Sequence, residues 1–94
     1  MAEYRVLYWQ TIPSVIEAKD ESGKHKLQLS ERFQKLIDAV AMKQGLAGTD
    51  GYLEQWRRGR AKNREGTAEA VAAAVLAELE AEFTDIRATA MGKA

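Results

Sequence analysis

The chain contains no cysteine, one histidine and one proline, and its formal net charge at pH 7 is zero. Without cysteine there are no disulfides and no thiolate metal ligands, and a reducing compartment is the simpler expectation. The single histidine, His25, has no second histidine or fixed acidic pair at a metal-ligand spacing, so we expect neither a metal site nor a cofactor. It also has no orienting partner and no nucleophile at a recognisable spacing, so we assign no catalytic residues and do not expect an enzyme.

Long apolar runs are also missing. The longest extends from Ala70 to Ala77 and is too short to cross a bilayer. Residues 1–5 lack the charged and apolar regions of a secretory signal. With 94 residues, 46% of them hydrophobic and 30% charged, the chain has the composition of one globular domain. These features predict a cytoplasmic protein that does not bind membranes.

The hydrophobic period changes near Ser30. Before it, the patterns at residues 4–11, 15–19 and 24–29 predict strands, with a turn at residues 20–23 in which Gly23 supplies a positive φ. These strands form a three-stranded antiparallel meander. The first strand carries apolar residues on both faces, which is typical of a central or doubly covered strand.

After Ser30 the apolar residues recur at helical spacing. Ser30 is expected to cap a helix that ends at Gly45, and Thr49 or Asp50 to cap a short second helix. Thr67 caps an alanine-rich helix that is expected to extend to Met91, with its last turns overhanging a domain of this size. The predicted fold is a two-layer α+β domain with two or three helices packed on one face of the sheet. We expect one domain over residues 1–87 and a disordered tail over residues 88–94.

The strongest local charge lies between residues 57 and 66, which hold five basic side chains and one glutamate. We expect a polar, basic connection over residues 59–66. Such a segment binds nucleic acids in some proteins, but the chain is neutral, its pI is near 6.6 and it has no recognisable nucleic-acid motif. The last helix carries five acidic residues that offer a second explanation, neutralisation of the loop within the domain.

The two tryptophans carry the largest apolar surfaces. We expect both to fill the core, but an exposed tryptophan beside arginines would anchor a partner. The predicted contact surface is therefore Trp56, Arg57, Arg58 and Arg60, with Trp9 as a second candidate. The uncovered face of the first strand is predicted to be closed by a partner or by a second copy of the chain.

Three segments, at residues 4–13, 30–42 and 48–58, resemble the bacterial "virulence factor" domain family. The resemblance covers roughly residues 3–84 and includes the N-terminal domain of conserved virulence factor C, in which helical repeats follow. Fusion to such binding scaffolds implies an interaction or accessory role. Free-standing members are associated with one-carbon enzymes that use folates or corrinoids. The resemblance supplies no catalytic residues.

We therefore predict a small protein-interaction or accessory module of this family without catalysis of its own. One alternative is an accessory subunit of a one-carbon enzyme system, whose site forms only with another chain. The other is a nucleic-acid-binding regulator that uses the basic residues 57–64.

Overall fold

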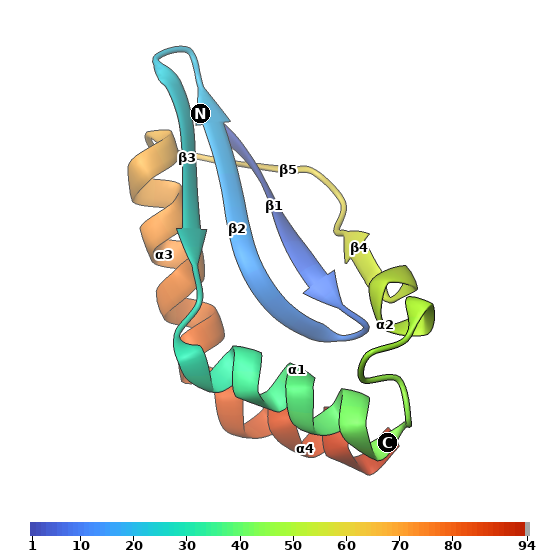
Figure 1. Ribbon diagram of the computed structural model, residues 1–94. Coiled ribbons are helices and arrows are strands. Elements are labelled where there is room, and N and C mark those ends of the chain that lie inside the picture. Colours follow the sequence, from blue (N-terminus) through green and yellow to red (C-terminus); the bar gives the residue numbers. More distant parts are fainter. Residues whose placement is uncertain (94) are drawn as a thin grey trace.

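The structure is a computed structural model that describes residues 1–93 (Figure 1). It confirms the α+β class. The elements in chain order are β1 (Ala2–Trp9), β2 (Ile12–Asp20), β3 (Gly23–Gln28), α1 (Glu31–Lys43), α2 (Asp50–Glu54), β4 (Trp56–Arg58), β5 (Lys62–Arg64), α3 (Ala68–Ala81) and α4 (Phe83–Lys93). Ala94 lies outside the described residues.

The sheet is antiparallel, with the order β3-β2-β1-β4 and with β5 also paired to β1. The predicted meander of β1, β2 and β3 is confirmed, including the turn at Gly23, whose φ is 148°. The expected connection over residues 59–66 is only partly correct, because Lys62–Arg64 pairs with residues 2–4 of β1. Strands β4 and β5 form where they do because they satisfy backbone groups along the outer edge of β1.

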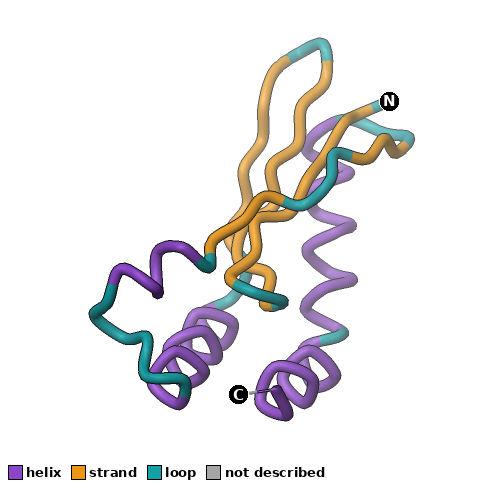
Figure 2. Tube along the Cα trace, turned by 90° about the vertical axis from the view of Figure 1, so that its right-hand side faces the viewer, coloured by secondary structure: helices purple, strands orange, loops and turns teal. Residues whose placement is uncertain are grey.

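The two faces of the sheet differ sharply in composition. Cross-strand rows on one face hold Tyr4, Ala18 and His25, and then Val6, Ile16 and Leu27. Helix α3 lies along this face in both views (Figures 1 and 2). In the part of the chain that the structure describes, no helix lies over the other face in the region of these rows (Figures 1 and 2). The second face of β1 is covered only at the end of the strand, where Trp9 is fully buried against Tyr52 of α2.

Helix α1 has the predicted apolar stripe, and Phe33, Leu36, Ile37 and Val40 are all buried. Ser30 takes the N-cap position with extended φ and ψ, but its hydroxyl does not cap the helix. Instead it donates to Oε1 of Glu80 at 2.8 Å. The hydroxyl of Thr67 does cap α3, because it accepts from the backbone N–H of Ala70.

The continuous helix expected from Thr67 to Met91 is wrong in one respect. The chain bends at Glu82, so that α4 turns away from α3 and packs against α1 (Figure 1). The rings of Phe33 and Phe83 meet edge to face at 5.0 Å between centroids. The bend thus converts turns that would overhang the domain into a buried contact. The expected disordered tail is also incorrect for residues 88–93, which complete α4 and include the buried Ala90.

Two carboxylates accept hydrogen bonds that connect α3 to β2 and to the start of α1. Asp20, at the end of β2, accepts a 2.7 Å hydrogen bond from the backbone N–H of Ala68 in the first turn of α3. Glu80, near the end of α3, accepts from Ser30 and from Arg32 at the start of α1. None of the helices within residues 1–93 is long and apolar enough to cross a bilayer.

Candidate functional site: the open face of the sheet

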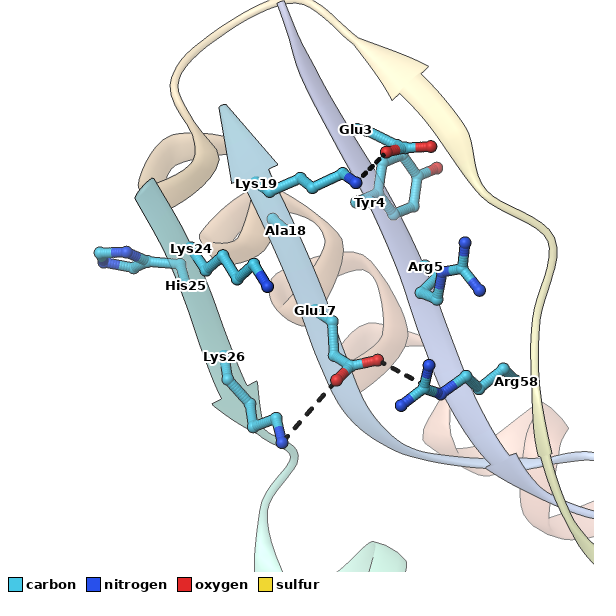
Figure 3. Close-up of a pocket in the computed structure, with 10 residues that line it drawn as sticks. All are labelled: Glu3, Tyr4, Arg5, Glu17, Ala18, Lys19, Lys24, His25, Lys26 and Arg58. Atoms are coloured by element: carbon cyan, nitrogen blue, oxygen red, sulfur yellow. Dashed lines mark ion pairs between the residues drawn. The ribbon is translucent and has the colours of Figure 1, made fainter. Parts of the chain in front are cut away.

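The uncovered side of the sheet is a charged hollow of about 490 Å³ (Figure 3). Alternation along the strands brings its charged side chains together from β1, β2, β3 and β4. We call this surface the open face and define it by seven residues: Glu3, Arg5, Glu17, Lys19, Lys24, Lys26 and Arg58. Five of the seven are basic and two are acidic, so the open face is positive within a neutral chain.

Three ion pairs cross the open face. Lys19 Nζ lies 3.1 Å from Glu3 Oε2. Glu17 stands between two cations, 3.7 Å from Lys26 Nζ and 4.0 Å from Arg58 Nε. The basic side chains are largely exposed, the two carboxylates are partly exposed, and the last two distances are long, so each pair contributes little to stability. The pairs are therefore available for exchange with an incoming anion.

The other two cations have no such partner. Among the residues that the structure describes, no carboxylate lies at ion-pair distance from Arg5 or Lys24. In addition, Lys24 lies directly opposite Lys19 in the register of β2 and β3. Like charges in directly opposite positions destabilise a sheet. Lys24 of β3 therefore lies beside a positive charge and, among the described residues, has no carboxylate at ion-pair distance.

The predicted contact residues do not form one surface. Trp9 is completely buried, and its Nε1 donates to the backbone carbonyl of Tyr52 at 2.8 Å. Trp9, the second candidate for a partner contact, is therefore not available to a partner, because its ring fills the core. Trp56 is half-buried beside Tyr52, with 6.3 Å between ring centroids, and pairs with Trp9 across β1 and β4.

The arginines of β4 point to opposite sides of the strand. Arg58 lies opposite Leu7 and reaches the open face (Figure 3). Arg57 lies opposite Tyr8, with its guanidinium 4.7 Å from the centre of that ring, and it donates to the backbone carbonyl of Gln10. Arg60 is exposed and does not line the hollow.

One member of the basic segment is neutralised within the domain. Arg64 makes a two-pronged ion pair with Glu78 of α3, with distances of 2.6 and 3.1 Å. Hydrogen bonding across the pair raises the pKa of Arg64 and lowers the pKa of Glu78. Neutralisation by the last helix thus applies to Arg64, whereas Arg57 and Arg58 bond elsewhere.

His25 is on the covered side of β3, and its ring points away from the charged rows in Figure 3. Its Nε2 lies 3.9 Å from Glu69 Oε2. Nearby, the carboxylate of Asp20, at the end of β2, accepts hydrogen bonds from the backbone N–H groups of Ala68, Ser22 and Gly23, and these bonds lower its pKa. No group of three or more metal-ligating side chains occurs within residues 1–93.

The open face was not identified from the sequence. Its members are spread over four strands, β1 to β4, and no stretch of the chain contains more than two of them in alternate positions. The signal was the repeated pattern of charges two residues apart, at residues 3 and 5, 17 and 19, and 24 and 26. Only the register of the strands places these three pairs side by side.

Comparison with protein-family models matches residues 7–91 to the family described as virulence factor. The match includes most of the chain, which therefore belongs to the virulence factor family, as the resemblance predicted. No curated protein and no solved structure matches the sequence.

Proposed function

We propose that this member of the virulence factor family is a protein-binding module without catalysis of its own, and that its open face holds an acidic segment of a protein partner. The observation that carries the proposal is the bare, hollowed side of the sheet, where five basic side chains outnumber two acidic ones. A positive concave surface attracts and orients an acidic partner through complementary charge.

The individual side chains suit carboxylates. Arg5 is half-buried, and its planar guanidinium can donate two parallel hydrogen bonds to one carboxylate. Arg58 lies beside it in Figure 3 and shares Glu17 with Lys26. Leu7 and Val15 form the next row of the same face and are half-buried, so they offer a small apolar area next to the charges.

Two other partners suit the open face less well. A second copy docked face to face about a two-fold axis would bring two positive surfaces together. Single-stranded nucleic acid binds on aromatic side chains that stack with bases. The two aromatic residues that line the hollow, Tyr4 and His25, belong to the row on the covered side of the sheet.

The test compares two double variants with equal changes of charge. A fluorescent oligoglutamate peptide is titrated with the wild type, with Arg5→Glu/Arg58→Glu and with Arg57→Glu/Arg60→Glu, at low and at high salt. We expect the first variant to weaken binding at least about tenfold and the second to change it less than about threefold. Circular dichroism verifies that each variant is folded.

Equal weakening by the two variants would assign binding to the basic segment as a whole and would contradict the open face. Absence of saturable oligoglutamate binding at low salt would refute the proposal. Tighter binding of a single-stranded oligonucleotide of the same charge, with a steep salt dependence, would instead favour the nucleic-acid alternative.

A further inference from the structure

We propose that the acidic segment binds by adding a strand to the outer edge of β3, with acidic side chains at two alternate positions that face Lys24 and Lys26. This inference rests on the proposed function and specifies how the partner is held. It follows from three features of the sheet, namely which edge is free, which backbone groups point outward, and which charges lie beside them.

The two edges of the sheet differ in whether another strand pairs with them. The outer edge of β1 is occupied by β4 and β5. Strand β3 pairs only with β2 among the described residues, and its other edge carries no strand over Gly23–Gln28 (Figure 1). An unpaired edge presents N–H and C=O groups that an extended peptide can bond.

The hydrogen-bond pattern shows which residues offer these groups. The N–H of Leu29 donates to the carbonyl of Ser14 at 2.9 Å, directly beyond the last register pair of β2 and β3. Because bonded and non-bonded pairs alternate in an antiparallel ladder, Leu27 and His25 also bond to β2. The β3 residues whose N–H and C=O groups point outward are therefore Lys24, Lys26 and Gln28.

The same residues carry their side chains on the open face, because they alternate with His25 and Leu27. A residue directly opposite Lys24 or Lys26 on an added strand would project from this face as well. An acid opposite Lys24 would relieve the repulsion between Lys24 and Lys19. An acid opposite Lys26 would continue the alternation of charge along the row of Arg5, Glu17 and Lys26.

The lysines of β3 also disfavour pairing between the β3 edges of two copies of the chain. Lysine on an edge strand prevents pairing between identical edges, since like charges would then lie near each other. An acidic strand meets no such barrier. The required pattern is short: acidic, any residue, acidic, in an extended segment antiparallel to β3.

The probe is the peptide acetyl-Thr-Thr-Glu-Val-Glu-Thr-Thr-amide, titrated into isotope-labelled protein and followed by NMR. In the proposed register both glutamates exchange backbone hydrogen bonds with β3, whereas the N–H of the central valine points away. We therefore compare a peptide N-methylated at both glutamates with one N-methylated at the valine. We expect saturable shifts of the amides of residues 24–28, and binding at least about tenfold weaker for the first methylated peptide but nearly unchanged for the second.

A charge exchange gives an independent test of register. The Lys24→Glu/Lys26→Glu variant should no longer bind the glutamate peptide. It should instead bind a peptide in which lysine replaces both glutamates. Equal affinities of the two methylated peptides, no saturable shift at millimolar concentrations, or failure of the exchange in a folded variant would overturn strand addition. Oligoglutamate binding that still depends on Arg5 and Arg58 would then leave the proposed function standing.

Discussion

Glu80 joins α3 to the start of α1, and its removal should loosen the domain at this junction. Its carboxylate accepts from the N–H of Ser30 at 2.7 Å, from the hydroxyl of Ser30 at 2.8 Å, and from Nε and Nη2 of Arg32 at 3.2 and 2.9 Å. The guanidinium of Arg32 also lies 4.4 Å from the centre of the Phe83 ring, at the first residue of α4. One carboxylate thus positions groups from three helices.

The expected loss of stability in Glu80→Ala depends on how far Glu80 and Arg32 are buried. Hydrogen bonds to a charged group contribute roughly 1.5–3 kcal/mol when protected, whereas exposed ion pairs contribute about 0.2–1 kcal/mol. The side chain of Glu80 is 23% exposed and that of Arg32 is 49% exposed, so the value lies between these limits. We expect Glu80→Ala to lower the free energy of unfolding by about 1–2 kcal/mol, which corresponds to roughly 5–10 °C in Tm for a domain of this size.

The effect should depend on pH. Burial alone would raise the pKa of Glu80, but the hydrogen bonds from Ser30 and Arg32 outweigh it and lower the pKa below its usual range. The stabilisation is therefore fully present above the unfolded value of about 4.3 and is lost as the pH falls through the lower folded value. The difference in unfolding free energy between wild type and Glu80→Ala should therefore become smaller as the pH falls below about 4.3.

Urea denaturation at several pH values measures this difference, and a double-mutant cycle with Arg32→Ala isolates the pair. The isosteric Glu80→Gln retains the shape of the side chain and should show a smaller loss of about 0.5–1 kcal/mol, because an amide oxygen still accepts from Ser30. A loss below about 0.5 kcal/mol for Glu80→Ala, or the absence of coupling to Arg32, would refute the role of Glu80 as the link between these helices.

Three further changes test the fold. Asp20→Asn should lower the urea midpoint at pH 7, with the difference from wild type narrowing as the pH falls below about 3.9, because hydrogen bonds from the first turn of α3 lower the pKa of Asp20. Trp9→Phe removes the donor to the Tyr52 carbonyl from a fully buried site and should cost about 2–4 kcal/mol in urea denaturation. Gly59→Ala should lower Tm with a cost of about 1–3 kcal/mol, since its Cβ would lie 2.9 Å from the Tyr8 ring and from a β1 carbonyl; unchanged thermal unfolding would contradict this packing.

The part of the fold that the sequence predicts correctly is the part with strong periodicity. The change at Ser30 separates the meander from the helices, and the stripe of α1 contains the residues that are buried. Strands β4 and β5 have three residues each and are mostly charged or polar, so they carry no β pattern of their own. They form because β1 has an unsatisfied edge, which is a property of the tertiary structure.

The bend at Glu82 was missed for a similar reason. Alanine favours helix throughout this region, and no glycine or proline interrupts residues 67–91. The chain bends because α4 gains contact with α1 through Phe83 and the buried Ala90, and Arg32 lies over the Phe83 ring. Helix propensity is a local property and does not include the stabilisation from these contacts between α4 and α1.

If the proposed function holds, the domain keeps the residues that stabilise the fold apart from the residues that bind the partner. The buried core includes Ile16, on the side of the sheet that α3 covers, and Phe33 of α1. At the end of β1 the core continues to the other side of the strand, where Trp9 packs against Tyr52 of α2. The charged rows on the other side add three partly exposed ion pairs, which contribute little to stability. These charges contribute little to folding, and Arg5 and Lys24 have no carboxylate at ion-pair distance among the described residues. Both observations support the proposal that the open face binds an acidic partner. The same separation means that charge reversal at Arg5 or Arg58 can alter binding while the core remains intact.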